Sequence, residues 1–292
     1  TIDSLCYFVA LRRIPVSAAQ QFFSAKLLMS SCENSSAVPL AFRQVETFGK
    51  LFLENNVNPD TLSKVQGIAY HDADGKVKIT PPRQMPKDLD VFPMPRRDLF
   101  LDKTGHWYQA ISTSRGCYYD CVFCSAATYW ETVRYHSPEK SIEDIENIMR
   151  HFPQQKNISI DDLLFAIHKK RLRRVVELIR EAKIHKKVSF VCTARASAFT
   201  EEIASLLKAM NVHSICFGYE SPHDRIVRWL KGPSANMKTN IRSMDLCRRY
   251  GMRPVGNYIA GTPIETLPEM AHTYWVIKNN TYRHTPNIFY MN

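Results

Sequence analysis

The sequence predicts an α/β fold, a partial (βα)6 TIM-like barrel with a smaller N-terminal α/β remnant or lobe. From Trp107 onward, short β-rich segments alternate with segments of helical periodicity, which is typical of parallel βα units. The alternation gives six such units, fewer than the eight that close a barrel. We therefore expect an open barrel whose site lies on the loops after the C-terminal ends of the strands.

The six expected strands are 107–112, 157–161, 188–193, 213–219, 253–260 and 287–291. The helices between them have recognisable N-termini. Ser137 precedes a proline, and Thr200 precedes apolar residues at helical spacing. Thr266 is followed three positions later by Glu269, which is the pattern of a capping box.

Three parts are expected along the chain: an N-terminal lobe over 1–87, a linker over 88–104 and the barrel over 105–292. Within the lobe, 18–30 and 45–54 have helical character. The segment 65–79 is expected to form a hairpin around a polar turn at Gly75. The linker is rich in proline and is expected to be extended.

The net charge of +11 in 292 residues favours anionic partners such as nucleic acid or phosphorylated substrates. The densest basic run, 169–174, continues into apolar residues at helical spacing, so we expect an amphipathic helix with a solvated basic face. Apolar runs are short and interrupted by charges, and the N-terminus has no secretory pattern. We expect a cytoplasmic protein without membrane association, trimmed at both ends.

Eight cysteines are present, and three of them fall within eight residues while the others are scattered among apolar neighbours. This distribution is unlike the evenly spread framework of a secreted disulfide protein and favours a reducing compartment. The scattered cysteines are expected to behave as small buried hydrophobic residues.

The clustered cysteines Cys117, Cys121 and Cys124 form a C-x3-C-x2-C loop directly after the first expected strand. Three thiolates can bind three irons of a [4Fe–4S] cluster, which leaves the fourth iron open to a ligand that donates nitrogen and oxygen. The alternative is a zinc knuckle, with His136 or Cys192 as the fourth ligand. Neither residue lies in the paired spacing typical of zinc sites.

The cysteine loop resembles that of the radical S-adenosylmethionine (SAM) superfamily, in its spacing, in Phe123 before the last cysteine and in the preceding strand. Further strings are similar to the subgroup with an N-terminal cobalamin-binding domain: 113–117, 134–139, 218–221 and 260–266. The resemblance extends over about 88–292. Residues 38–98 resemble only the end of a cobalamin domain, and its Asp-x-His-x-x-Gly loop is not found.

The resemblance implies an enzyme whose cluster binds the amino and carboxylate groups of SAM and cleaves it reductively. The resulting 5′-deoxyadenosyl radical abstracts hydrogen from a substrate that the barrel orients and shields from water. The implied substrate is a small molecule or natural product, and the implied electron donor is an external reductant such as flavodoxin or ferredoxin. With cobalamin the implied reaction is methylation, and without it a cyclisation or another radical rearrangement.

Six residues are expected to contact the cofactor SAM: Phe123, Asp161, Arg195, Glu220, Ser221 and Gly261. Phe123 stands where the family packs adenine, with core packing as the alternative. Arg195, just past the third strand, could pair with the carboxylate of SAM, and the alternative is a surface salt bridge.

Adjacent residues on a strand point to opposite faces, so only one of Asp161 and Asp162 is expected to enter the barrel. That carboxylate could reach the amino group of SAM or the substrate, and the other is expected to cap the loop. Glu220 and Ser221 are candidates for the ribose hydroxyls or the amino group, with a helix N-cap as the alternative for Ser221. Gly261 is expected to shape the loop that backs the adenine.

Two other functions fit parts of the pattern. The net charge and the cysteine loop would suit an RNA-modifying enzyme of the methylthiotransferase type, although further cluster cysteines and an RNA-binding module are not visible. The third hypothesis is a non-catalytic binding module whose fold is stabilised by a bound metal. Because no RNA-binding module is visible in the sequence, nucleic acid is not the expected partner.

Overall fold

The structure is a computed structural model, and it describes residues 51, 54, 56–82, 84–99, 109–130, 132–279 and 284–290. The chain divides into two compact units, Thr1–Leu99 and Phe100–Asn292. The boundary between them falls in the expected linker 88–104. The expected helix over 18–30, most of that over 45–54 and the start of the first strand lie outside the described residues.

The described part of the first unit consists of a short helix, a hairpin and a 3-10 turn: α4 (Pro59–Leu62), β1 (Ala69–His71), β2 (Val77–Ile79) and η1 (Arg97–Leu99). Strands β1 and β2 are antiparallel, with Ala69 opposite Ile79. In the turn, Asp72 Oδ1 accepts hydrogen bonds from the backbone N–H groups of Asp74 and Lys76. The hairpin expected over 65–79 is confirmed.

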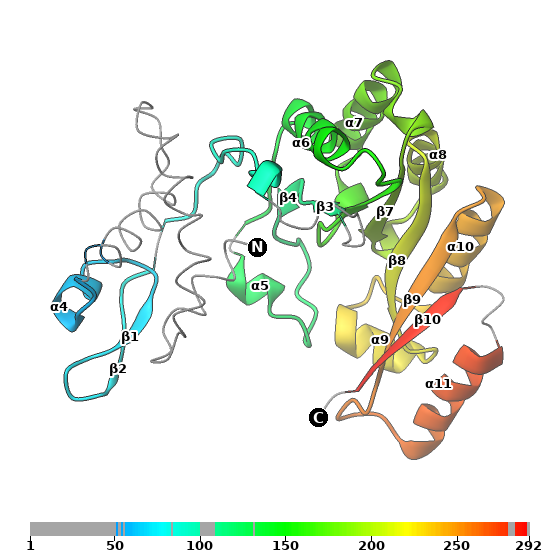
Figure 1. The fold of residues 1–292 in the computed structure, drawn as a ribbon. Helices are drawn as coiled ribbons and strands as arrows, with labels where there is room; N and C mark the ends of the chain where they lie inside the picture. The colour runs from blue at the N-terminus through cyan, green and yellow to red at the C-terminus, as the bar shows by residue number, and fades with distance from the viewer. Residues whose placement is uncertain are drawn as a thin grey trace. The chain divides into compact units, whose positions relative to one another are not determined.

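The second unit is built on a six-stranded parallel sheet in the order β10-β9-β8-β7-β6-β3 (Figure 1). Its strands are β3 (Gln109–Ile111), β6 (Asn157–Ile160), β7 (Ser189–Ala194), β8 (Val212–Glu220), β9 (Arg253–Ala260) and β10 (Thr285–Tyr290). A parallel sheet of this kind confirms the α/β class and the partial (βα)6 TIM-like barrel.

Seven α-helices are described in this unit: α5 (Ala126–Tyr129), α6 (Pro138–His151), α7 (Lys169–Glu181), α8 (Glu201–Ala209), α9 (Asp224–Lys231), α10 (Met237–Arg249) and α11 (Leu267–Asn279). Short 3-10 turns are η2 (Phe165–Ile167), η3 (Ile184–Lys186) and η4 (Ala196–Ala198). The expected N-caps are confirmed. Ser137 accepts a hydrogen bond from the backbone of Lys140, and Thr200 accepts one from that of Ile203.

The two faces of the sheet differ in their packing. On the outer face, strand residues such as Ile158 and Phe217 join side chains of α6, α7, α8 and α10 in one buried core (Figure 1). The opposite face carries Ser159, Thr193, Cys216, Asn257 and Asn287, which alternate with the core residues along the strands. We call it the inner face.

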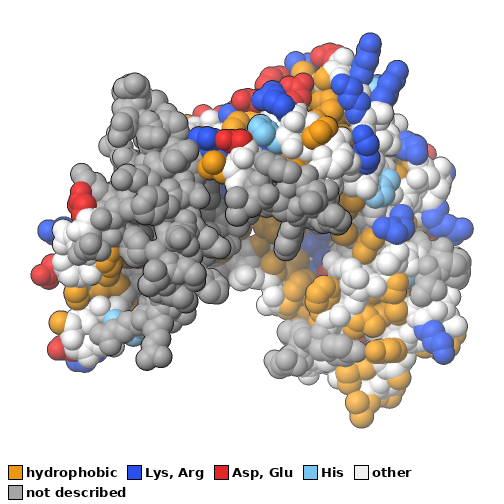
Figure 2. Space-filling model, viewed as in Figure 1, with side chains coloured by type: hydrophobic (Ala, Val, Ile, Leu, Met, Phe, Trp, Pro, Cys, Tyr) orange, Lys and Arg blue, Asp and Glu red, His pale blue; other side chains and the backbone are white. Residues whose placement is uncertain are grey.

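Helix α7 bears out the expected amphipathic pattern with one exception. Lys169 and Arg173 are exposed and pair with Glu202 of α8, and Figure 2 shows basic side chains interleaved with acidic ones on the helical surface. Arg171 lies in the same basic run but is buried. The prediction of a solvated basic face was wrong for Arg171, whose guanidinium finds backbone carbonyl partners inside the unit.

No helix among the described residues is long and apolar enough to cross a membrane.

The helical layer should be the main source of stability of the second unit. Leu207 of α8 is 0% exposed, whereas Leu267 of α11 is 77% exposed. Leu207→Ala should lower the free energy of unfolding by about 3 kcal/mol through a buried cavity, and Leu267→Ala by less than about 0.5 kcal/mol. Urea denaturation of the two variants measures this difference, and equal losses would contradict the assignment of the core.

Candidate active site

The cysteine loop follows β3 and is framed by the short strands β4 (Ser114–Arg115) and β5 (Arg134–Tyr135), which pair antiparallel. Gly116, directly before Cys117, has a φ of 96°. A Cβ atom at Gly116 would lie 2.6 Å from the backbone oxygen of Thr132. The chain therefore needs glycine to turn into the loop. Cys117 and Cys121 are half-buried, while Cys124 is exposed.

The segment that leads into the loop is held by a buried carboxylate. Asp162, 2% exposed, follows β6. Its Oδ1 accepts hydrogen bonds from the backbone N–H groups of Thr113 at 2.6 Å and Ser114 at 3.0 Å. Its Oδ2 accepts the hydroxyl of Thr113 at 2.6 Å. Hydrogen bonds to a charged acceptor are the strong ones, so Asp162 fixes this segment against the sheet.

The carbonyl side of Thr113 is held as well. The Thr113 oxygen accepts hydrogen bonds from the backbone of His136 at 2.9 Å and from Nη2 of Arg171 at 3.1 Å. Nε of Arg171 donates to the His136 oxygen at 3.1 Å, and its guanidinium lies over the ring of Tyr135. Arg171 thus joins both sides of the β4–β5 frame.

The far end of the cysteine loop contacts the C-terminus of α9. Val122 donates its backbone N–H to the Leu230 oxygen at 3.0 Å. Arg195 donates from Nη1 to Sγ of Cys121 at 3.4 Å and from Nη2 to the Lys231 oxygen at 2.6 Å. The guanidinium also lies 3.8 Å from the centre of the Tyr119 ring. Arg195 is buried at the loop, so the alternative of a surface salt bridge was wrong.

Glu220, at the end of β8, forms a buried ion pair with Lys231. Their side chains are 5% and 8% exposed, and Nζ of Lys231 lies 3.1 Å from Oε1 of Glu220. The same ammonium donates to the Gly218 oxygen. A Cβ atom at Gly218 would collide with both charged groups. Burial raises the pKa of Glu220, and the charges of Lys231 and Arg195 oppose that effect.

The backbone at Glu220 is left-handed, with φ 62°, and the register with β9 shifts between Gly218 and Glu220. Such a conformation is unfavourable for a residue with a side chain. It turns the Glu220 carboxylate toward Lys231.

The structure rejects one of the two roles considered for Ser221 and one of the two considered for Phe123. Ser221 is fully buried, and its hydroxyl accepts a hydrogen bond from the backbone of His223 at 3.2 Å. The N-cap of α9 is His223, so the N-cap alternative for Ser221 was wrong because the N-cap position lies two residues later. Phe123 is 37% exposed, which contradicts the core-packing alternative.

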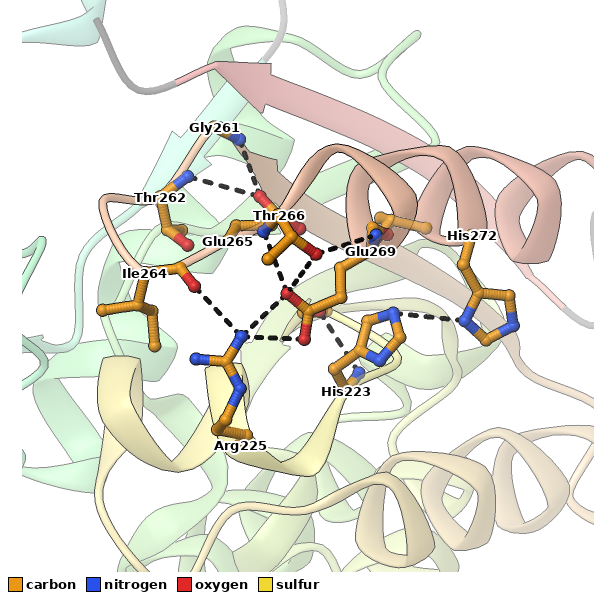
Figure 3. Close-up of polar contacts among 11 residues, drawn as sticks. His223, Arg225, Gly261, Thr262, Ile264, Glu265, Thr266, Glu269 and His272 are labelled. Carbon is orange, nitrogen blue, oxygen red and sulfur yellow. Dashed lines mark hydrogen bonds and ion pairs between the residues drawn. The ribbon is translucent and has the colours of Figure 1, made fainter.

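The loop after β9 is shaped by two glutamates (Figure 3). Oε2 of Glu265 accepts hydrogen bonds from the backbone N–H groups of Gly261 at 2.8 Å and Thr262 at 3.3 Å. The carboxylate of Glu269 accepts a hydrogen bond from the backbone N–H of Thr266, and the backbone N–H of Glu269 donates to the Thr266 hydroxyl oxygen, which confirms the capping box. Gly261 therefore shapes the loop through its left-handed backbone, with φ 81°, and its N–H group is already bonded to Glu265.

Arg225 of α9 clamps the same loop. Its Nη2 contacts both carboxylate oxygens of Glu269, at 2.8 and 2.7 Å, and the Ile264 oxygen at 3.0 Å (Figure 3). The hydrogen bonds from Arg225, followed by those from Thr266, lower the pKa of Glu269 to about 2. The pair remains charged at neutral pH, so α9 is tied to the β9 loop as well as to the cysteine loop.

The two aspartates after β6 are separated as the alternation predicts. Asp161 is exposed and its Oδ1 accepts the hydroxyl of Ser159 at 2.5 Å, whereas Asp162 holds the loop segment. Sequence reasoning missed Arg171 and Lys231. The one signal in the sequence was Gly218, which belongs to the segment 218–221 that resembles the family. A glycine is needed there because the Lys231 ammonium lies against it.

The cysteine loop fits an iron–sulfur cluster. Among the described residues, no three His, Cys, Asp or Glu side chains gather around one point as a single ion requires. A [4Fe–4S] cluster instead spreads its thiolates over separate irons, so three cysteines on one loop match its chemistry. Cys192, one alternative fourth ligand for zinc, packs in the core of the outer face.

The family model described as the radical SAM superfamily matches residues 111–274. The chain belongs to the radical SAM superfamily. The enzymes of this family use a [4Fe–4S] cluster and SAM.

Two curated relatives show which members the chain is similar to. An uncharacterized methyltransferase of Pyrococcus horikoshii is 30% identical, over 86% of this chain and 54% of its own length. The cytidylyl-2-hydroxyethylphosphonate methyltransferase of Streptomyces wedmorensis is 24% identical, over 76% of this chain and 48% of its own. The chain thus spans about half the length of these relatives.

Among solved structures, the radical SAM methyltransferase TsrM of Kitasatospora setae, with tryptophan and a SAM analogue bound, matches with a TM-score of 0.67. The identity is 14%, over 85% of this chain and 49% of that chain. A likeness at this identity shows a shared fold.

The hold of Asp162 on the loop can be tested against its neighbour. Asp162→Ala removes three hydrogen bonds to a buried charge and should lower the free energy of unfolding by about 3 kcal/mol. Asp161→Ala, one residue away but exposed, should cost less than about 1 kcal/mol. Chemical denaturation checks both, and a smaller loss for Asp162→Ala than for Asp161→Ala would refute the clamp.

Proposed function

We propose that this chain is the barrel of a radical SAM enzyme that cleaves SAM reductively and modifies a small-molecule substrate, by cobalamin-dependent methylation or by radical rearrangement. The observation that carries the proposal is the three-cysteine loop beside Arg195 and the Glu220–Lys231 pair. The cysteine loop, Arg195 and Glu220 lie at the C-terminal ends of the parallel strands β3, β7 and β8, where barrel enzymes place their chemistry.

Cys117, Cys121 and Cys124 would hold the cluster. When bound, a [4Fe–4S] cluster with an open iron supplies the electron that cleaves the sulfonium of SAM. Arg195 donates a hydrogen bond to Sγ of Cys121 at 3.4 Å, so its guanidinium lies directly beside the cysteine loop. The ring of Tyr119 under the guanidinium keeps it in place.

Glu220 is our candidate for the polar groups of SAM. Lys231 donates a hydrogen bond to one of its oxygens, and the positive charge of Lys231 opposes the burial that raises the pKa of Glu220. A charged carboxylate accepts strong hydrogen bonds from an ammonium or from ribose hydroxyls. Ser221 would support this corner from its buried position, and Gly261 would set the shape of the loop behind the adenine. Phe123 offers an exposed ring for adenine to pack on.

The names of the relatives support methylation, since both curated proteins above are called methyltransferases. A further structure of TsrM carries cobalamin together with a [4Fe–4S] cluster. We propose the unit boundaries 1–87, 88–104 and 105–292 for lobe, linker and barrel, with the lobe as the end of a cobalamin-binding domain. We propose the cytoplasm as the location and flavodoxin or ferredoxin as the class of reductant.

Anaerobic reconstitution with iron, sulfide and hydroxocobalamin, followed by an optical spectrum, tests the cofactors together. We expect a brown protein that yields 5′-deoxyadenosine from SAM and a reductant. The triple variant Cys117→Ala, Cys121→Ala, Cys124→Ala should lose the iron, while Cys247→Ala in the core should keep it. A colourless parent protein with about one zinc per chain would refute the proposal.

The role of Glu220 is tested by affinity for SAM. Glu220→Gln keeps the size of the side chain but loses its charge, and should raise the Kd for SAM about tenfold. Glu177→Gln, on the outer surface of α7, is the matched control and should leave the Kd unchanged. Anaerobic calorimetry measures both. An unchanged Kd in Glu220→Gln would exclude the carboxylate from the SAM site.

A further inference from the structure

Two histidines that the proposed reaction does not use meet at the surface of the second unit. His223 is the N-cap of α9, and His272 lies in the second turn of α11. Although 49 residues separate them in the sequence, Nδ1 of His272 lies 3.1 Å from Nε2 of His223. Their rings face one another in the close-up (Figure 3), with an angle of 66° between the ring planes. The pair therefore bridges the two helices.

Both rings are held in place by their neighbours. The backbone N–H of His223 donates to the buried Ser221 hydroxyl at 3.2 Å, which fixes the chain where this side chain begins. Trp275, three residues after His272 and on the same face of α11, stacks on the His272 ring, with 5.9 Å between ring centres and 23° between planes. His223 is half-buried and His272 is exposed. Solvent therefore reaches a pair of nitrogens that is already assembled.

The spacing of the two nitrogens suits a metal ion. Transition metal ions bind imidazole nitrogen at about 2.0–2.1 Å, so two such ligands of one ion lie about 2.9–3.4 Å apart in octahedral or tetrahedral geometry. The 3.1 Å between His223 and His272 falls within this range. A neutral imidazole carries its proton on one nitrogen and coordinates through the other. An ion between the two facing nitrogens would replace the proton that they now share, after small rotations of the rings.

The charged side chains around the pair cancel one another. Oε1 and Oε2 of Glu269 are 2.8 and 2.7 Å from Arg225, and Asp224 pairs with Arg228 at 3.4 Å. The pair therefore does not stand in a field of one sign. Among the described residues no third His, Cys, Asp or Glu completes a metal cage, so water would fill the remaining positions. Two imidazoles with water suit Cu²⁺, Ni²⁺ and Zn²⁺, whereas Mg²⁺ and Ca²⁺ require oxygen ligands.

We propose that His223 and His272 form a bidentate site for one divalent transition metal ion of the copper, nickel and zinc class. The ion cross-links the N-terminus of α9 to α11. The other end of α9 receives Val122 of the cysteine loop and presents Lys231 to Glu220, so the ion steadies the helix on which those contacts depend. The site goes beyond the proposed function and shares no residue with the proposed SAM contacts.

Calorimetric titration with Ni²⁺ tests the site. The thiols of the cysteine loop also bind such ions, so the background is the full chain, without a histidine tag, that carries Cys117→Ala, Cys121→Ala and Cys124→Ala. We expect one Ni²⁺ per chain and no binding of Mg²⁺ under the same conditions. Equal affinity for Mg²⁺ would overturn the inference, because imidazole ligands do not select that ion.

Single substitutions in this background separate chelation from binding elsewhere. His223→Gln and His272→Gln should each raise the Kd for Ni²⁺ about a hundredfold, because the second ligand acts at a high effective concentration only while the first is present. His185→Gln is the matched control. Its ring lies in η3 and contacts the Ile179 oxygen, so this variant should keep the Kd of the background.

The fluorescence of Trp275 locates the ion in the chain with its cysteines intact. Ni²⁺ quenches a nearby indole, and the Trp275 ring stacks on His272. We expect a loss of fluorescence on addition of Ni²⁺ that is absent in Trp275→Phe and in His272→Gln. This measurement decides the matter even where the cysteine variant does not fold. Quenching that survives in both variants, or a Kd unaffected by His223→Gln and His272→Gln, would leave the pair as a hydrogen bond only and overturn the inference.

Discussion

The carboxylate of Asp162 is buried and accepts three hydrogen bonds from Thr113 and Ser114. Those two residues lead into the turn at Gly116 and from there into the cysteine loop. Their other side is held by Arg171 and the backbone of His136. A negative and a positive side chain, both buried, thus grip one short stretch of backbone from opposite sides. Every later contact of the loop, including that of Cys121 with Arg195, depends on this starting geometry.

Helix α9 is the second organising element, because it contacts three parts of the site at once. Its last carbonyls receive Val122 and Arg195, the Lys231 side chain pairs with Glu220, and Arg225 holds the β9 loop. The contacts of Val122 and Arg195 use the C-terminal carbonyls that a helix leaves without internal partners. The cysteine loop and the candidate SAM residues are therefore positioned by a single short helix.

Much of the fold could be predicted from the sequence because its signals are local. Strand positions follow from short β-rich runs between helical periods, and the N-caps Ser137 and Thr200 from side chains that bond within three residues. The site was less accessible to sequence reasoning. Arg171 and Lys231 looked like surface residues because their partners are distant in the sequence. Arg171 bonds to the backbone oxygen of Thr113, and Lys231 bonds to that of Gly218. Lys231 also pairs with Glu220, which follows a shift in the register of β8 with β9. The choice between Asp161 and Asp162 likewise depended on which face the strand presents.

The described part of strand β3 spans Gln109–Ile111 and, among the described strands, pairs with β6 alone. Central strands such as β8 are flanked on both sides and carry fully buried side chains. Local opening costs least where backbone pairing and apolar burial are least. At this edge of the sheet, the buried contacts of Asp162 and Arg171 with Thr113 therefore replace the support that a second neighbouring strand would give. A cofactor held by the cysteines would add a further cross-link at the same edge.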